Sequence, residues 1–182
     1  MKTLLLARHG KSDWGDSSVG DFDRPLNTRG EEDSPKMASY LQQCGYLINQ
    51  IISSEAVRAL ATAEQYRKHL TPDQELITHG DLYLAPEATI INIINNIHSN
   101  FNSVMLVGHN PGMTDAINFL CHEQIEDMST CSVGIVQFDV NNWRDIKERS
   151  GDLLAYEFPK KLKKREAWVK VKALHQLQKI KL

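Results

Sequence analysis

Short apolar runs alternate along the chain with longer segments of helical pattern. The apolar runs predict strands at residues 4–7, 48–53, 75–78, 104–108, 134–140 and 153–158. The first, second and fourth of these have no polar face, which is typical of parallel strands that are buried on both sides. Helices are predicted over residues 31–43, 55–70, 86–98 and 111–120. The alternation predicts an α/β fold, a doubly wound, mostly parallel sheet with helices on both faces.

Length and charge divide the chain into a body and a tail. Its 182 residues suffice for one buried core, and 41% hydrophobic and 24% charged residues are usual for a globular protein. The net charge of −2 conceals an imbalance. Residues 160–182 hold nine Lys and Arg and one Glu, so this segment carries +8 and residues 1–159 carry −10. We predict one domain over residues 1–159 and a basic C-terminal extension over residues 160–182.

The extension shows the pattern of an amphipathic helix. Trp168, Val171, Leu174 and Leu177 recur at helical spacing among lysines. Such a helix could lay its apolar stripe on the acidic body. It could instead meet an acidic partner, a membrane surface or nucleic acid.

Cysteine usage and hydropathy point to a cytoplasmic protein without a metal. Three scattered cysteines predict reduced thiols rather than a disulfide framework: Cys44, Cys121 and Cys131. The spacing of Cys121, His122 and Cys131 fits no common zinc pattern, so no metal site is expected. No run reaches the roughly 18 apolar residues of a membrane span. Arg8 and His9 also end the first apolar run before it could form the core of a signal peptide.

Polar residues follow three of the predicted strands directly. Arg8, His9 and Gly10 follow the first strand, Arg58 comes shortly after the second, and His109 follows the strand at 104–108. In doubly wound sheets, ligands bind beyond the carboxyl ends of the strands. The sequence therefore predicts that two arginines and two histidines converge at one edge of the sheet.

Two arginines at one site favour an oxyanion, because the guanidinium fork matches carboxylate or phosphate oxygens. Helix starts would add backbone N–H groups, with Ser53 or Ser54 as an N-cap one turn before Arg58 and Pro111 as a first helical residue after His109. A dianionic phosphoryl group fits this set best.

His9 is the candidate nucleophile, because a neutral imidazole can attack phosphorus and split one displacement into two easier steps. Its other ring nitrogen would donate its proton to a backbone carbonyl. Gly10 would allow a sharp turn close to the phosphoryl group, and His109 would donate a hydrogen bond to a phosphoryl oxygen. Taken singly, each residue has a structural alternative, a satisfied polar histidine or an arginine that pairs with a surface acid.

Five segments in order resemble the histidine phosphatase superfamily, which has the phosphoglycerate-mutase-like fold, and look closest to its SixA-type phosphohistidine phosphatases. They are LLLARHGKSDW (4–14), DFDRPLNTRG (21–30), IISSEAVRALATAE (51–64), LYLAP (82–86) and VMLVGHNPGMT (104–114). The resemblance implies that Arg8, Arg58 and His109 bind phosphate and that His9 becomes phosphorylated. No cofactor is expected.

Two features of the resemblance leave alternatives open. Arg24 lies in a family segment and would either line the pocket or pair with Asp21 or Asp23. Larger members of the superfamily carry a glutamate general acid, which has no counterpart in THGDLYLAPE (78–87). Asp21 and Asp81 are the candidate substitutes.

The missing acid favours P–N bonds, because imidazole leaves more readily than an alkoxide and needs less help from a proton donor. The chain also lacks the length for lid insertions that shield an intermediate from water, which favours hydrolysis over transfer. We therefore predict a phosphatase that acts on phosphohistidine in a protein, such as a phosphorelay component. A phosphatase of a small phosphorylated metabolite is the alternative. A non-catalytic binding module is disfavoured by the intact set of two arginines and two histidines.

Overall fold

The computed structural model describes residues 1–162, so the predicted amphipathic helix of the tail lies outside the described residues. The described chain is helical at residues 159–162, where Leu162 packs into the core. Its strands are β1 (Lys2–Arg8), β2 (Gln50–Ser53), β3 (Ile77–Thr78), β4 (Ser103–Gly108), β5 (Val133–Phe138) and β6 (Gly151–Glu157). Its helices are α1 (Thr28–Gln43), α2 (Val57–Leu70), α3 (Glu87–Asn95) and α4 (Gly112–Leu120), with short 3-10 helices at Gly80–Leu82 (η1) and Trp143–Asp145 (η2).

The six strands form a single mixed sheet in the order β3-β2-β4-β1-β5-β6. The pairs β3–β2, β2–β4 and β4–β1 are parallel, whereas β5 is antiparallel to β1 and β6 is antiparallel to β5. Because β1, β2 and β4 run in one direction, their carboxyl ends lie at the same edge. The predicted α/β fold with a mostly parallel sheet is confirmed.

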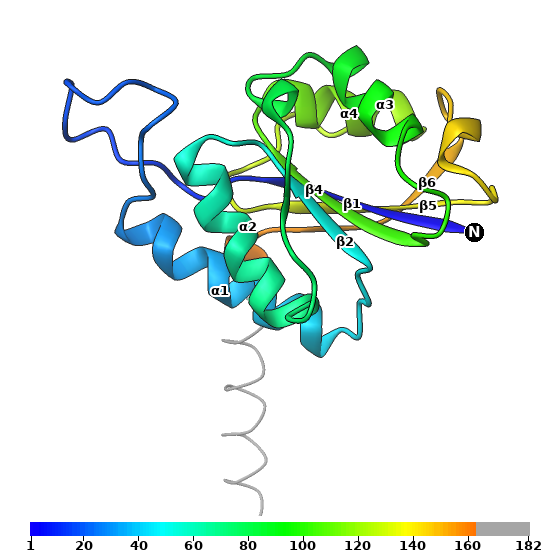
Figure 1. Ribbon diagram of the computed structural model, residues 1–182, viewed down its shortest axis with the longest axis horizontal. Coiled ribbons are helices and arrows are strands. Elements are labelled where there is room, and N and C mark those ends of the chain that lie inside the picture. The colour runs from blue at the N-terminus through cyan, green and yellow to red at the C-terminus, as the bar shows by residue number, and fades with distance from the viewer. Residues whose placement is uncertain (163–182) are drawn as a thin grey trace, which may run out of the picture.

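Helices cover both faces of the sheet, with α1 and α2 on one side and α3 and α4 on the other (Figure 1). Successive residues of β1 explain why the strand has no polar face. Leu4 and Leu6 pack in the cluster under α3 and α4, and Leu5 and Ala7 pack in the cluster under α1 and α2. Each buried leucine contributes about 1.5–3 kcal/mol through the hydrophobic effect. This burial on both faces fixes β1 as the centre of the fold.

The start of α1 lies three residues before its predicted position. The Asn27 side chain caps the helix by accepting a hydrogen bond from the backbone N–H of Gly30 at 3.0 Å. An asparagine at this position satisfies one of the helix's unpaired N–H groups. The helix therefore begins at Thr28.

The predicted serine cap of α2 is wrong. Ala56 is the N-cap and makes no side-chain capping bond, while Ser53 ends β2 and Ser54 lies between the strand and the helix. The hydroxyl of Ser54 lies 2.8 Å from Nε2 of His109 and accepts only a long hydrogen bond, 3.4 Å, from the backbone N–H of Ala56, which precedes the first residue of the helix. Pro111 is the N-cap of α4 rather than its first helical residue.

A long irregular segment, residues 9–27, joins β1 to α1 and projects at the upper left of Figure 1. A single β-bridge, between Ser12 and Leu26, ties its two ends together. It therefore stands over the carboxyl edge of the sheet. Over residues 1–162, no helix combines the length and the apolarity needed to cross a membrane.

Candidate active site

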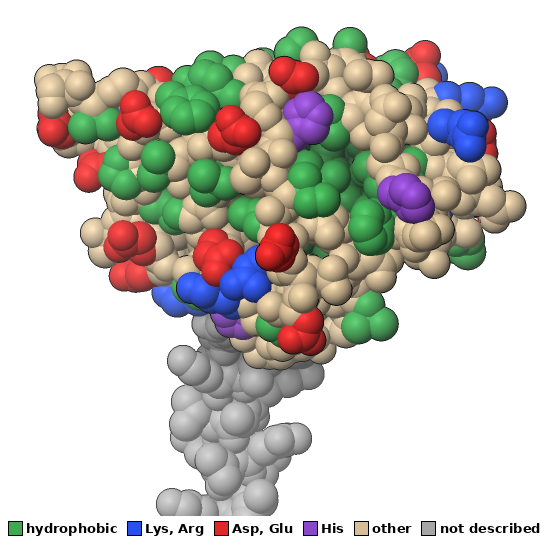
Figure 2. Space-filling view, in the orientation of Figure 1, with side chains coloured by type: hydrophobic (Ala, Val, Ile, Leu, Met, Phe, Trp, Pro, Cys, Tyr) green, Lys and Arg blue, Asp and Glu red, His purple; other side chains and the backbone are tan. Residues whose placement is uncertain are grey.

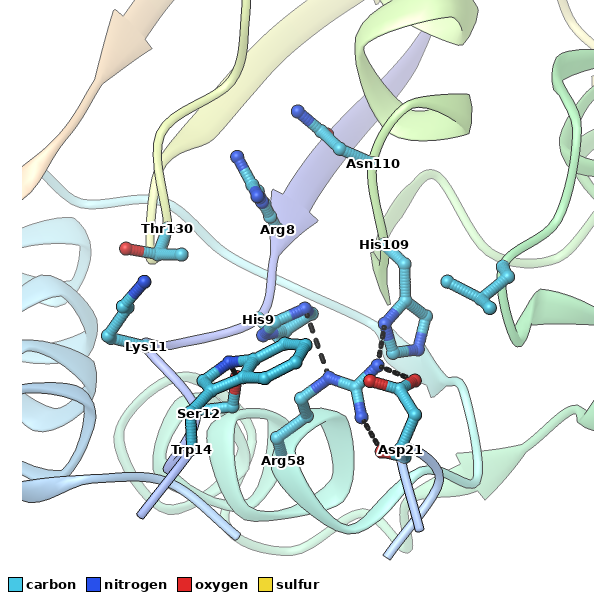
Figure 3. Close-up of a pocket in the computed structure, with 11 residues that line it drawn as sticks. Arg8, His9, Lys11, Ser12, Trp14, Asp21, Arg58, His109, Asn110 and Thr130 are labelled. Atoms are coloured by element: carbon cyan, nitrogen blue, oxygen red, sulfur yellow. Dashed lines mark hydrogen bonds and ion pairs between the residues drawn. The ribbon is translucent and has the colours of Figure 1, made fainter. Parts of the chain in front are cut away.

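The four residues that follow the parallel strands line one cavity of about 350 Å³ (Figure 3): Arg8, His9, Arg58 and His109. Arg8 is the last residue of β1, Arg58 lies in the first turn of α2, and His109 directly follows β4. The remaining lining residues are Lys11, Ser12, Trp14, Asp21, Leu84, Asn110 and Thr130.

The ring of His9 is 7% exposed and is held in one tautomer. Its Nδ1 lies 2.7 Å from the carbonyl oxygen of Gly10, which can only accept, so Nδ1 carries the proton. Nε2 then accepts a hydrogen bond from the Nε of Arg58 at 3.3 Å. The pKa of His9 is lowered from 6.5 to about 4, mainly by burial and also by the charges of Arg58 and Arg8, against the opposing effects of the Gly10 hydrogen bond and of Asp21. His9 is therefore a neutral imidazole at physiological pH.

The guanidinium of Arg58 is 3% exposed and joins both histidines to Asp21. Its Nη2 donates to the Asp21 carboxylate at 2.8 Å and to Nδ1 of His109 at 3.3 Å. Its Nη1 donates to the backbone carbonyl of Asp21. Arg58 thus lies at the centre of the site, with its charge offset by one carboxylate.

The contact with Arg58 also sets the tautomer of His109. An arginine can only donate, so Nδ1 of His109 accepts and Nε2 holds the proton, which it gives to the Ser54 hydroxyl at 2.8 Å. The pKa of His109 is lowered to about 3, mainly by burial and also by the neighbouring His9 and Arg58. The His9 and His109 ring centroids are 4.8 Å apart. Two neutral imidazoles therefore face each other across the cavity.

Arg8 carries a buried donor that lacks an acceptor. Its Nη1 donates to the carbonyl of Met128 and lies 3.4 Å from the Asp127 carboxylate. Its Nε is buried and has no hydrogen-bond partner within residues 1–162. An unsatisfied buried donor costs about 1–3 kcal/mol. An oxyanion in the cavity would remove this cost.

Of the two candidate acids, the structure places only Asp21 in the site. Its Oδ2 accepts from the Tyr83 hydroxyl at 2.7 Å and from Arg58, and these hydrogen bonds hold the pKa of Asp21 below its usual value. Asp21 is therefore a carboxylate at neutral pH and has no proton to donate. The Asp81 side chain is 79% exposed, lies beside His79 and lines a separate cavity.

Arg24 was expected to line the pocket or to pair with Asp21 or Asp23. Within residues 1–162, its guanidinium does neither. The group stacks on the Trp14 ring at 4.1 Å and donates to the carbonyl of Asp13 at 3.3 Å. Trp14 lines the cavity, so Arg24 contributes to the site indirectly, by holding the Trp14 ring in place.

Glycine at position 10 is required by packing and not by the expected sharp turn. Its φ lies outside the left-handed region. A Cβ atom there would lie 2.9 Å from Oγ of Ser34 and 3.0 Å from Leu26. The close approach of α1 to the end of β1 leaves no room for a side chain.

Sequence reasoning missed several residues of the cavity. Lys11 and Ser12 follow Gly10 directly, and Asn110 follows His109. Their closeness in sequence to predicted site residues could have indicated that they line the cavity. Thr130 comes from the irregular segment before β5, where no periodicity places it. Leu84 is 52% exposed and has a φ of 47°, a conformation that is strained for leucine.

No cysteine side chain lines the cavity among residues 1–162, although the backbone N–H of Cys131 donates to the carbonyl of His9 at 3.0 Å. Burial raises the pKa of Cys121 to about 12 and that of Cys131 to about 11, so both thiols stay protonated. In the part of the chain that the structure describes, no group of three or more His, Cys, Asp or Glu could hold a metal ion.

Comparisons with known proteins match most of the chain. The model of the histidine phosphatase superfamily (branch 1) matches residues 4–83. An uncharacterised chloroplastic protein of Arabidopsis thaliana is 31% identical over 159 residues, which cover 82% of this chain and 72% of that protein. The structure of the protein histidine phosphatase SixA complexed with tungstate superposes with a TM-score of 0.76 at 21% identity, over 88% of this chain and 99% of that one. For SixA from Agrobacterium tumefaciens the TM-score is 0.75 at 23% identity, over 87% and 98%. These two likenesses establish the fold.

Proposed function

The chain belongs to the histidine phosphatase superfamily and is a phosphatase, and we propose that it hydrolyses phosphohistidine in a protein through a phosphorylated His9. One observation carries the proposal. A neutral imidazole with an unprotonated Nε2 faces a cavity whose Arg8 Nε is buried and unpartnered. This combination suits a nucleophile beside an oxyanion site.

In the first step, the phosphoryl oxygens bind between Arg8 and Arg58. The hydrogen bond from Arg58 Nε to Nε2 of His9 breaks, which leaves the lone pair of Nε2 free to react. Nε2 of His9 then attacks phosphorus, and the P–N bond to the substrate imidazole breaks as the new P–N bond forms. The leaving imidazole takes a proton from solvent. Nδ1 of His9 keeps its proton throughout, because the Gly10 carbonyl holds it and stabilises the charge that develops on the ring.

In the second step, a water molecule attacks the phosphorus of phosphorylated His9. The bond between Nε2 and phosphorus breaks, and the electron pair returns to Nε2. The water loses its proton to bulk solvent or to the released phosphate. The arginines offset the negative charge on the oxygens in both transition states.

Two features favour phosphohistidine over a phosphate ester. Asp21 is ionised, and an alkoxide leaving group would need a proton that it does not hold. Two residues that line the cavity are also exposed apolar side chains, with Trp14 64% and Leu84 52% exposed. Grouped exposed apolar residues mark surfaces that meet other proteins. A phosphatase of a small metabolite is the alternative.

The test compares turnover of a phosphohistidine-bearing protein with that of a panel of small phosphate esters, with and without chelator. We expect kcat/KM for phosphohistidine to exceed that for every ester, and chelator to leave both rates unchanged. Efficient hydrolysis of one ester, with slow turnover of phosphohistidine, would favour the metabolite alternative.

A further inference from the structure

A second cavity of about 530 Å³ adjoins the candidate active site. The two cavities share Arg8, Lys11 and Thr130, so they meet at these three residues. Figure 3 shows Lys11 and Thr130 on the side of His9 that is away from His109. We call this second cavity the basic groove. Its other lining residues are Arg29, Asp127, Ser129, Tyr156, Phe158, Pro159 and Lys160.

The groove is positively charged although residues 1–159 together are strongly acidic. Among residues 1–162, four cations line it, Arg8, Lys11, Arg29 and Lys160, against the one lining carboxylate of Asp127. Lys11 and Lys160 are exposed, and neither forms an ion pair with another residue of the described range 1–162. The Arg29 side chain is 49% exposed and shares its charge with Asp33 at 3.2 Å.

Acidic side chains gather elsewhere on the molecule. Figure 2 shows them on the projecting end formed by the segment between β1 and α1, where Asp13, Asp16 and Asp23 are exposed. The groove is therefore a local exception to the charge of the body. An anionic group that approaches His9 is repelled by the projecting segment and attracted by the groove.

An aromatic wall gives the groove a fixed shape. The rings of Tyr156 and Phe158 lie 5.4 Å apart, and the Tyr156 hydroxyl accepts a hydrogen bond from the backbone N–H of Ser129 at 3.0 Å. Pro159 is buried beside them. A partly apolar wall next to exposed cations suits a peptide segment with acidic side chains. Their carboxylates would pair with the lysines, while the apolar parts of the peptide would pack on the rings.

We propose that the basic groove binds carboxylate side chains that flank the phosphohistidine of the protein substrate. The proposal rests on the proposed function for the identity of the phosphorylated residue. The three shared residues make the two sites continuous, so one substrate segment can place its phosphoryl group beside His9 and its acidic neighbours beside Lys11, Arg29 and Lys160.

Binding is measured with peptides that carry a phosphonotriazole side chain, a non-hydrolysable analogue of phosphohistidine, flanked by either Glu or Gln. Titration calorimetry at low salt should give a Kd about five- to tenfold lower for the Glu peptide, the size expected of a few partly exposed ion pairs. The difference should shrink at high salt, because salt screens exposed charges.

Lys160→Glu is the main variant, because Lys160 is exposed and lines the groove without lining the cavity of His9. It should bring the two Kd values within about twofold of each other. Arg29→Gln is a second variant that should also reduce the preference. Lys147→Glu makes the same charge change on an exposed lysine after η2, at the opposite end of β1, and should keep the preference.

Equal Kd values for the two peptides in the wild type, or a preference that survives in both Lys160→Glu and Arg29→Gln, would overturn the groove assignment. Turnover of authentic phosphohistidine peptides is followed in parallel. If the Glu preference is present but no phosphohistidine is hydrolysed, the groove assignment stands and the proposed function fails.

Discussion

The hydroxyl of Ser54 determines which nitrogen of His109 can hold a proton. In the structure, Nε2 donates to Ser54 and Nδ1 accepts from Arg58. When phosphoryl oxygens take the Arg58 donors, His109 can donate to them through Nδ1 only if Ser54 donates to Nε2 instead. A hydroxyl can do either. Ser54 is therefore a positioning residue for His109.

Ser54→Ala should lower kcat about tenfold and leave KM nearly unchanged, the loss expected for one hydrogen bond made in the transition state. The matched control is Ser53→Ala, because the Ser53 hydroxyl is equally buried but donates to the Ser54 carbonyl. Nitrogen-detected NMR should show the His109 proton on Nε2 in the free wild type and on Nδ1 with vanadate bound. A wild-type kcat in Ser54→Ala would refute this role.

Asp21 is a counterion that phosphate must displace from Arg58. Its negative charge faces the same guanidinium that would hold the phosphoryl group. Asp21→Asn should therefore lower the inhibition constant of inorganic phosphate about fivefold, the scale of one partly exposed charge pair. Asp81→Asn, which removes the same charge from an exposed position, should leave it unchanged. Loss of ester hydrolysis in Asp21→Asn with phosphohistidine turnover spared would instead assign Asp21 as a proton donor.

At the scale of elements, the site depends on how closely α1 packs against the end of β1. A Cβ atom at Gly10 would meet Oγ of Ser34 at 2.9 Å. Gly10→Ala should lower the free energy of unfolding by about 1–3 kcal/mol, the usual cost of overpacking. Denaturant unfolding measures this loss.

The double variant Gly10→Ala/Ser34→Ala tests the cause, because it removes the nearest clashing atom. It should recover part of the stability that Gly10→Ala loses, beyond the sum of the two single changes. Simple additivity of the two changes would mean that the contact with Ser34 is not what requires glycine.

The elements that the sequence predicted well are those that are buried on both faces. β1 and β4 are apolar on both faces because helices cover both, and that pattern alone placed Arg8, His9 and His109 at strand ends. The start of α2 was less predictable, because a serine after a strand is a typical helix cap, whereas the Ser54 hydroxyl contacts His109, which is distant in sequence. The segment that supplies Thr130 and the stacking of Arg24 on Trp14 have no local signal, since both depend on contacts distant in sequence.

At the scale of the whole molecule, the two buried histidines link stability to pH. Their folded pKa values, about 4 for His9 and about 3 for His109, lie below the unfolded value of 6.5. At pH values between the folded and the unfolded pKa, the unfolded chain binds more protons than the folded one. The free energy of unfolding therefore falls as the pH falls below 6.5. Each histidine should lower the free energy of unfolding by about 2 kcal/mol between pH 6.5 and pH 5.

Denaturant unfolding at pH 7 and pH 5 measures this loss, with His9→Gln/His109→Gln as the comparison. The double variant should show a much smaller loss over the same range. Inorganic phosphate should also reduce the loss in the wild type, because a bound anion raises the pKa of both rings. Equal losses in the wild type and the double variant would contradict burial of two neutral imidazoles.

The central claim is that His9 carries the phosphoryl group during turnover. The most direct measurement is rapid mixing with a ³²P-labelled phosphohistidine peptide, an alkaline quench that preserves P–N bonds, and mapping of the label by mass spectrometry and ³¹P NMR. We predict an alkali-stable, acid-labile phosphate on Nε2 of His9 that forms and decays within the turnover time and is absent in His9→Ala. Label on any other residue, or turnover at the wild-type rate in His9→Ala, would contradict it.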